Sequence, residues 1–385
     1  MHVYFDNSAT TQPAPEVVES VNEVLSKYYG NPSSIHGLGV QAEKLLRRST
    51  ELISEQLGIE ENELVFTSGG TESNNLAIKG IAFAYQARGR HLMTSAVEHS
   101  SVYEVCRTLE KHFNFEVTYL PVDRQGRVSA EDVKKAMRED TILVSIMHVN
   151  NELGSIQPVE EIGQIVRRFP KAFFHVDDVQ GIGKVPLSIR QAHIDLLSLS
   201  GHKIHAPKGI GVLFVRKGIE LYPLLHGGSQ QNAMRSGTEN VAGIVAVAKA
   251  IRLVKEKEKQ HAEHFFQLKQ RMVQNLEKLD EVKVNSPLDR RSFAPHIVNV
   301  SFPGIKPEVL VHALEEKGIF VSTKSACSSK IEQPSRILQA AGMAREQANS
   351  AIRISFSMYN TLEEVDYVSE ALAEILPYYQ KVMKV

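Results

Sequence analysis

Cysteine is scarce in this chain: two occur among 385 residues, Cys106 and Cys327, and they lie far apart in the sequence. Two distant cysteines exclude a disulfide framework as the organising principle of the fold, and they favour a reducing cytosol. One of the two thiols is therefore available for chemistry.

Net charge and long apolar runs are lacking as well. The formal net charge is −1, far from the basic excess that nucleic-acid-binding proteins carry. No apolar run approaches the length of a membrane span, and the N-terminus has neither the basic region nor the cleavage site of a secretion signal. We therefore expect a full-length, cytoplasmic protein that binds neither nucleic acid nor membrane directly.

Two common kinds of ligand motif are also missing. The chain has no Gly-x-x-x-x-Gly-Lys-Ser/Thr loop, and no Gly-x-Gly-x-x-Gly follows its first strand, which disfavours the usual modes of nucleotide binding. Histidines number 15, but neither His261 with His264 nor His202 with His205 has a further ligand at zinc spacing. We expect no metal site.

Alternating strands and helices make up most of the chain. This alternation predicts an α/β fold with a mostly parallel sheet that is covered by helices on both faces. Helical spacing over 241–279 predicts one long connector helix with the charged run 255–259 on a solvated face, and the rest predicts a compact α+β unit. We expect a large domain over 15–255 and a small domain formed by 1–14 and 256–385. The expected strands of the large domain are 63–67, 91–95, 116–120, 141–148, 172–176, 194–199 and 212–215.

Five polar residues follow strands of the predicted sheet. They are Thr71, His99, Asn151, Asp177 and Lys203. Ligands of open α/β sheets bind at the carboxyl ends of the strands, where all five would lie. The glycine-rich turn 68–74, between a strand and a helix, is of the kind that presents backbone N–H groups to a phosphate. We therefore predict that a single cofactor contacts all five residues.

Lys203 and Asp177 suggest what that cofactor is. A lysine at the end of a core strand is desolvated, which favours the neutral amine and permits a Schiff base with an aldehyde; a solvated loop lysine and a phosphate clamp are the alternatives. A buried carboxylate needs a partner, and a pyridinium nitrogen would serve Asp177. The alternative for Asp177 is a helix N-cap, although Asp178 could take that role instead.

His99, already named, and two further residues are candidates for chemistry. His99 could stack on an aromatic cofactor and exchange protons near neutral pH, or be a structural histidine. Cys327 lies in a small polar segment between Lys324 and Lys330, which favours a reactive thiolate, whereas Cys106 reads as a buried helix residue. Arg353 in a strand core fits a carboxylate clamp or, about as well, an ordinary ion pair.

These residues belong to ordered motifs that extend over nearly the whole chain. The motifs lie at 4–11, 30–36, 66–74, 148–152, 200–203, 235–238 and 325–329. Together they resemble the pyridoxal-phosphate-dependent cysteine desulfurases of the NifS/IscS type, within aminotransferase class V and fold-type I. The Ser-Ala-Cys-Ser-Ser sequence at 325–329 resembles the group I desulfurases.

The resemblance implies a fold and a set of cofactor contacts. The fold is a large domain with a mostly parallel seven-stranded sheet and a smaller α+β domain. Lys203 would form the Schiff base with pyridoxal phosphate, and Thr238 would reach the phosphate from the neighbouring subunit of a homodimer. Around the cofactor ring, His99 would stack on its face, Asp177 would contact the ring nitrogen, Gln180 the phenolic oxygen, and Asn151 would also contact the cofactor. Around the phosphate would lie Gly70, Thr71, Ser200 and His202.

The resemblance also implies a reaction. Asn151 and Arg353 would hold the carboxylate of L-cysteine, and Lys203 would remove its Cα proton. The Cys327 thiolate would then take the substrate sulfur as a persulfide, and L-alanine would leave after a protonation assisted by His99. A sulfur-acceptor protein would follow: an iron–sulfur scaffold, a tRNA-thiolation enzyme or a thiamine-pathway protein.

Two other interpretations compete with this one. The first is a different enzyme on the same fold, an aminotransferase or a selenocysteine lyase; an aminotransferase has no need for Cys327. The second is a degenerate scaffold that keeps the fold for docking partners, which conflicts with the retention of the whole catalytic set. The chain departs from the usual family pattern at Asp178, Ala206, Lys324 and the pair Gln231-Asn232. None of these departures removes a catalytic group, and those at Lys324 and 231–232 leave the sulfur acceptor open.

Overall fold

The computed structural model describes residues 1–323 and 335–383. Cys327, the whole motif 325–329 and Lys324 lie outside the described residues. Among the described helices, none is both long enough and apolar enough to cross a membrane.

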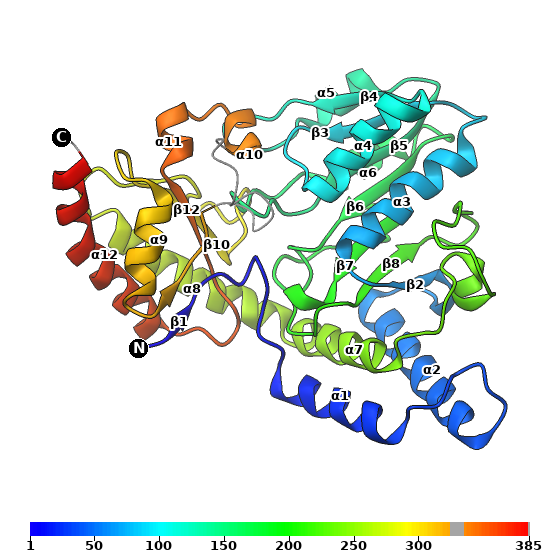
Figure 1. Ribbon diagram of the computed structural model, residues 1–385. Coiled ribbons are helices and arrows are strands. Elements are labelled where there is room, and N and C mark those ends of the chain that lie inside the picture. Colours follow the sequence, from blue (N-terminus) through cyan, green and yellow to red (C-terminus); the bar gives the residue numbers. More distant parts are fainter. Residues whose placement is uncertain (324–334, 384–385) are drawn as a thin grey trace.

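A seven-stranded sheet forms the centre of the larger part of the molecule (Figure 1). Its spatial order is β2-β8-β7-β6-β5-β3-β4, and only β8 runs antiparallel to its neighbours. The prediction of a mostly parallel seven-stranded sheet is therefore confirmed. The strands are β2 (Leu64–Thr67), β3 (His91–Ser95), β4 (Glu116–Leu120), β5 (Thr141–Met147), β6 (Phe173–Asp177), β7 (Leu196–Ser200) and β8 (Gly211–Val215).

Helices cover both faces of this sheet because its strands are apolar on both sides. Along β7, Leu196 packs into one hydrophobic cluster while Leu197 and Leu199 pack into another, as the two-residue period of a strand requires. The first cluster contains α3 (Gly70–Tyr85) and α4 (Ser100–Phe113). The second contains α5 (Ala130–Ala136), α6 (Val159–Val166) and α7 (Val241–Glu256), with α1 (Pro15–Lys27) and α2 (Gly37–Leu57) packed on α7.

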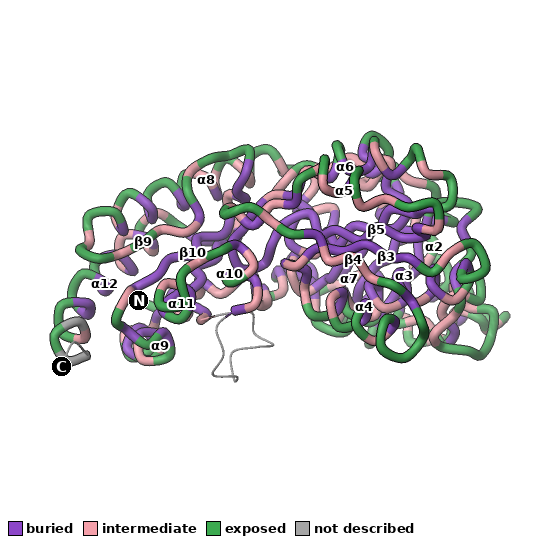
Figure 2. The backbone as a smooth tube through the Cα atoms, turned by 90° about the horizontal axis from the view of Figure 1, so that it is seen from above, coloured by how far each residue is buried: buried purple, intermediate pink, exposed green. Residues whose placement is uncertain are grey.

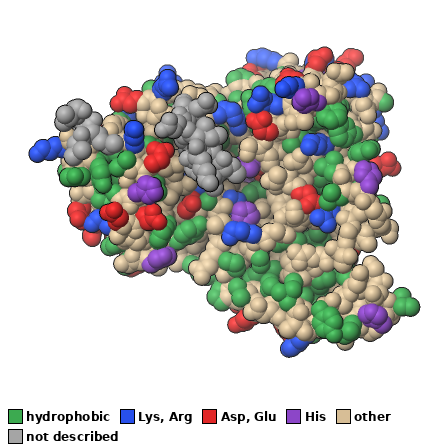
Figure 3. Space-filling view, in the orientation of Figure 1, with side chains coloured by type: hydrophobic (Ala, Val, Ile, Leu, Met, Phe, Trp, Pro, Cys, Tyr) green, Lys and Arg blue, Asp and Glu red, His purple; other side chains and the backbone are tan. Residues whose placement is uncertain are grey.

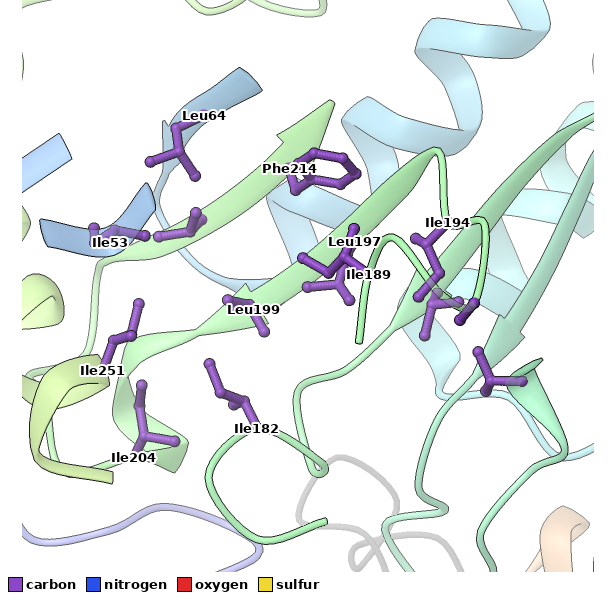
Figure 4. Close-up of a cluster of buried hydrophobic side chains, with 14 of the residues drawn as sticks. Ile53, Leu64, Ile182, Ile189, Ile194, Leu197, Leu199, Ile204, Phe214 and Ile251 are labelled. Atoms are coloured by element: carbon purple, nitrogen blue, oxygen red, sulfur yellow. The ribbon is translucent and has the colours of Figure 1, made fainter. Parts of the chain in front are cut away.

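Figure 4 shows part of the second cluster. Leu199 of β7 and Phe214 of β8 point into the same apolar layer, which Ile251 of α7 and Ile182 close from the other side. Figure 2 shows the result for the whole molecule, with buried strands inside and exposed helix faces outside. Apolar burial of this kind fixes the strand register, because a shift by one residue would turn every strand over.

A second core surrounds a three-stranded antiparallel sheet in the order β12-β10-β9. Val3 and Phe5 from the N-terminus belong to this core, and every other member comes from residue 265 onward. The proposed division into 15–255 and 1–14 with 256–385 agrees with this packing but stays a prediction. The elements are β1 (Val3–Tyr4), α8 (Glu258–Leu276), β9 (Lys283–Val284), β10 (Ile297–Ser301), α9 (Pro307–Glu315), β11 (Ile319–Phe320), β12 (Ala351–Ser355) and α12 (Leu362–Met383).

Two short helices lie between the cores. They are α10 (Arg336–Ala340) and α11 (Arg345–Asn349), and the second was not expected from the sequence. Ile337 and Leu338 of α10 pack against Val97 and Met147 from the large sheet. The chain on the C-terminal side of residues 324–334 is thus attached to the large part of the molecule.

The expected single helix over 241–279 is wrong. The chain forms α7 and α8, and Lys257 between them has non-helical dihedral angles (φ −119°, ψ 22°). Lys255 and Glu258 form a 2.9 Å ion pair across this break, and their side chains are only 19% and 15% exposed. The charged run is therefore not one solvated face. The break allows α7 to pack on the large sheet and α8 on the small core.

Candidate active site

One cavity of about 290 Å³ lies at the carboxyl ends of the central strands. All five of the strand-end residues predicted to share a cofactor line this cavity. The five residues come together because parallel strands end at one edge of a sheet, and their contact with one cofactor stays a prediction. The lining consists of Ser8, Ala9, Gly70, Thr71, Asn74, His99, Ser101, Met147, Val149, Asn151, Asp177, Val179, Gln180, Ser200, His202, Lys203 and Arg353.

Two predicted site residues are not among those that line the cavity. Thr238 follows the short helix η3 (Gln230–Ala233) and is exposed. It does not line the cavity of its own chain. Cys327 lies outside the described residues.

Lys203 ends the short helix η2 (Gly201–Lys203), directly after β7. Its Nζ donates to the carbonyl oxygens of Ser8 and Ala9, at 2.6 Å each. The N-terminal segment is held there by Thr11, whose backbone N and Oγ1 both donate to the carbonyl of His202 at 2.8 and 3.0 Å. Backbone atoms of the N-terminal segment therefore hold the amine in the cavity wall.

Asp177 is the last residue of β6 and only 5% exposed. Its Oδ1 accepts from the backbone N of Val179 at 3.1 Å, and its Oδ2 accepts from Asn74 Nδ2 at 2.8 Å. The sequence left a helix N-cap open for Asp177 or Asp178, and neither residue caps a helix. The Oδ1 of Asp178 lies 2.6 Å from His148 Nδ1, and burial raises the pKa of this carboxyl while His148 opposes the shift.

His99 is the N-cap residue of α4. Its Nδ1 accepts from the backbone N of Ser101 at 3.2 Å and lies 2.8 Å from Ser101 Oγ. Burial lowers the pKa of the imidazole; the Asp177 charge opposes this shift, while Lys203 and Arg336 add to it. His99 is therefore neutral at neutral pH.

An anion cradle occupies one end of the cavity. It combines the N-terminus of α3, which begins after Gly69, with Ser200 and His202. Gly69 has φ +154°, and a Cβ on Gly211 would lie 2.6 Å from Gly69 Cα, so glycine is needed at both positions. Burial lowers the pKa of His202 to about 4. Backbone N–H groups and a helix dipole of this kind bind phosphate.

Arg353 on β12 brings the second core to the cavity. Its Nη1 donates to the carbonyl oxygen of Asn151 and its Nη2 to Asp6 Oδ1, both at 2.8 Å. The ordinary ion pair considered from the sequence is therefore present. The buried Nε has no partner among the described residues, so its N–H is available to a bound ligand.

Sequence reasoning missed several residues around the site. Asn74 is the last residue of the motif 66–74, and Ser101 lies two residues after His99. Neither side chain was predicted to belong to the site. Glu98 is fully buried beside His99; its Oε1 accepts from Ser95 Oγ at 2.6 Å and from the backbone N of Met147 at 3.0 Å, and burial raises its pKa to about 8. Arg336 donates to the carbonyl oxygens of Ala96 and Glu98.

Comparison with known proteins agrees with this site. The Aminotransferase class-V family model matches residues 3–368. A protein of Lactobacillus delbrueckii subsp. bulgaricus named NifS/IcsS protein homolog is 46% identical, over 99% of this chain and 98% of its own length. A protein of Dictyoglomus turgidum named cysteine desulfurase IscS is 44% identical, over 97% and 94%.

This chain belongs to the NifS/IscS cysteine desulfurases of aminotransferase class V. Among solved structures, a NifS-like protein has a TM-score of 0.92 at 40% identity and covers 98% of this chain, with all of its own length matched. A structure described as SspA in complex with cysteine has a TM-score of 0.80 at 36% identity, over 93% of this chain and 100% of its own.

Members of this class use pyridoxal phosphate, and the cavity fits that cofactor. Five buried polar atoms in its wall have no hydrogen-bond partner among the described residues, although buried polar atoms are almost always bonded. They are Ser8 Oγ, Asn74 Oδ1, Asn151 Oδ1, Gln180 Oε1 and Arg353 Nε. The cavity has one group for each reactive part of the cofactor. The anion cradle would suit its phosphate, the buried carboxylate of Asp177 its ring nitrogen, and the amine of Lys203 its aldehyde.

The buried Glu98 predicts a pH dependence of stability. Its pKa is about 8 in the folded chain and near 4.5 when unfolded. Between these values the folded state holds a proton that the unfolded state has lost, so stability falls as pH rises through this window. Glu98→Gln removes that loss. We expect chemical denaturation to show a stabilisation that grows from pH 4.5 to 8, to a few kcal/mol in order of magnitude.

Glu63→Gln is the matched control. Burial acts on Glu63 too, but hydrogen bonds from Arg190 and from the backbone N–H groups of Lys217 and Glu60 hold its pKa below the ordinary value. This variant should lose stability at neutral pH, and the loss should fade in acid. The same pH profile for both variants would contradict the assignment of Glu98 as protonated.

Proposed function

We propose that this chain releases sulfur from L-cysteine, forms L-alanine, and carries the sulfur as a persulfide on Cys327. The observation that supports this most directly is the common cavity of Lys203, Asp177 and the anion cradle. An amine, a carboxylate and a phosphate site in one cavity are the set that pyridoxal-phosphate chemistry requires. The site-residue roles below belong to this proposal.

Each side chain has a task that follows from its position. When bound, pyridoxal phosphate would supply the electron sink that acidifies the substrate Cα–H and weakens the Cβ–S bond. Asp177 would hold a proton on the ring nitrogen, and Lys203 would remove the Cα proton as a base. Arg353 and Asn151 hold the substrate carboxylate. Gly70, Thr71, Ser200 and His202 hold the phosphate, and Gln180 the phenolic oxygen.

Sulfur transfer assigns the last step to Cys327. Its thiolate attacks the substrate sulfur; an S–S bond forms as the Cβ–S bond breaks, and the carbon fragment takes up a proton to give alanine. Five residues before Cys327, Ser322 exchanges two backbone hydrogen bonds with Arg353, at 3.2 and 2.6 Å. Eight residues after it, Ser335 Oγ donates to Glu152. Both ends of this segment are thus bound to residues at or beside the cavity.

A homodimer is the proposed assembly, because Thr238 does not line the cavity of its own chain. Figure 3 shows apolar side chains along the lower edge of the molecule, where α1 and α2 lie in Figure 1. An apolar surface of this extent is typical of an interface. The exposed large apolar side chains of α1, of α2 and of the chain between these helices are Val18, Leu25, Tyr29, Ile35, Leu38 and Val40, and Ile35 is 99% exposed.

The sulfur acceptor stays open among an iron–sulfur scaffold, a tRNA-thiolation enzyme and a thiamine-pathway protein. A cytoplasmic location, expected from the two cysteines, also stays a prediction.

Replacing Lys203 by alanine tests the proposed base. Cofactor-loaded Lys203→Ala should form alanine from L-cysteine at least about a hundredfold more slowly than the wild type, since general-base catalysis contributes about 10²–10⁴. Lys208→Ala changes an exposed lysine of the same loop and should keep the wild-type rate. Turnover by Lys203→Ala at the wild-type rate would rule out its role.

Replacing Cys327 by serine tests the persulfide. Cys327→Ser should retain the cofactor's absorbance but lose alanine formation and protein-bound persulfide, because the sulfur has no thiolate to attack it. Cys106→Ala is the control: Cys106 is buried on α4, and burial raises its pKa to about 12. Mass spectrometry of intact protein should find the additional sulfur in Cys106→Ala and not in Cys327→Ser.

Charging the apolar surface tests the homodimer. The double variant Leu25→Glu, Ile35→Glu should reduce the molar mass measured by light scattering from that of two chains to that of one, because two buried carboxylates would have no partner. Tyr378→Glu on α12, where the wild-type side chain is 64% exposed, is the control and should leave the mass of two chains. A monomeric wild type would refute the assembly.

A further inference from the structure

A continuous path of side-chain hydrogen bonds connects Asp177 with His99. Asn74 Nδ2 lies 2.8 Å from Asp177 Oδ2 and 2.9 Å from Ser101 Oγ, and Ser101 Oγ lies 2.8 Å from His99 Nδ1. All four residues line the cavity. Asn74 and Ser101 are buried, so water does not compete strongly for these bonds.

Chemistry fixes the direction of every bond in this path. The amide nitrogen of Asn74 carries two hydrogens and only donates, so one goes to the Asp177 carboxylate and the other to Ser101 Oγ. The hydroxyl hydrogen of Ser101 is then free for His99 Nδ1. The backbone N–H of Ser101 also points at Nδ1, at 3.2 Å. Because Nδ1 accepts from two donors, the proton of the neutral ring is on Nε2.

We propose that Asn74 and Ser101 are positioning residues that lock His99 in the neutral tautomer with its proton on Nε2, in an orientation imposed by the Asp177 carboxylate. We call these two residues the histidine lock. The carboxylate orders the amide, the amide orders the hydroxyl, and the hydroxyl occupies Nδ1.

The charges around His99 act in the same sense as the lock. Lys203 on η2 and Arg336 on α10 both disfavour an imidazolium, and so does the positive N-terminal end of α4, on which His99 is the cap. Glu98, next to His99 in the chain, is protonated below about pH 8 and adds no charge there. Among the charged groups of the described residues that act on His99, only Asp177 favours the imidazolium, and Asn74 and Val179 already engage its two oxygens.

The lock deepens the proposed function and rests on it for its catalytic meaning. Because Nδ1 is occupied, Nε2–H is the ring N–H that His99 can offer to the cavity. There it donates a hydrogen bond to an anionic atom of the substrate. It does not act there as a base, so removal of the Cα proton is left to Lys203. Activity should therefore fall in acid when protonation of Nδ1 breaks the bonds from Ser101.

The test is the titration of His99 in the full-length, cofactor-loaded protein. Nitrogen NMR with labelled histidine reports both tautomer and midpoint, and His99→Gln assigns the signal. We expect the Nε2–H tautomer and a midpoint below the ordinary value in the wild type. Ser101→Ala should raise the midpoint and mix the tautomers, because the neutral form loses a donor. Loss of that bond should also slow alanine formation about three- to tenfold.

Two further variants make the result specific. Ser101→Thr keeps the hydroxyl and should restore the wild-type tautomer. Ser145→Ala removes a comparable buried hydroxyl, which lies 2.8 Å from His175 Nδ1, and should leave His99 unchanged. If Ser101→Ala fails to fold, Asn74→Ala should shift the midpoint of His99 in the same upward direction, because Ser101 Oγ loses its orienting donor.

The outcomes separate this inference from the proposed function. An unchanged His99 tautomer and midpoint in both Ser101→Ala and Asn74→Ala would overturn the lock, as would an equal shift in Ser145→Ala. If the wild type forms no alanine while His99 responds as described, the proposed function fails and the lock stands.

Discussion

Parallel pairing of β5, β6 and β7 is the constraint on which the site depends. Met147 pairs with Asp177, so β5 and β6 end together, and Asp177 pairs with Ser198, so β7 extends two residues further to Ser200. Their register is held by apolar side chains on both faces, far more strongly than by any polar contact at their ends. A buried carboxylate can therefore be placed beside the helix α3 and the lysine on η2 without having to stabilise the fold itself.

The cavity is closed by chain segments that do not belong to the large sheet. The N-terminal residues Ser8 and Ala9 accept from Lys203, and Arg353 joins Asn151 to Asp6. These contacts bridge the two hydrophobic cores through buried and partly buried polar atoms. Buried polar contacts of this kind are costly when half made, which makes the relative position of the two cores specific. The cofactor cavity is thus a product of both cores.

Much of this could be predicted from the sequence. Apolar runs of strand length located the seven strands, and the residues after them located the cavity wall, because both signals are local. The break at Lys257 was missed because no glycine or proline marks it; it is the demand of two separate cores that ends α7. Asn74 and Ser101 were also missed. Their hydrogen-bond partners are set by packing between elements more than twenty residues apart, which no local pattern encodes.

The two fixed ends of the cysteine-bearing segment have an evolutionary consequence. Ser322 is tied to the backbone of Arg353, and Ser335 with Arg336 is tied to Glu152 and to the carbonyl groups just before His99. Neither attachment uses a side chain from 324–334. The intervening sequence can therefore diverge, in length or in charge, while the substrate and cofactor contacts stay in place. Under the proposed function, a single framework would in this way serve different sulfur acceptors through exchange of one short stretch of chain.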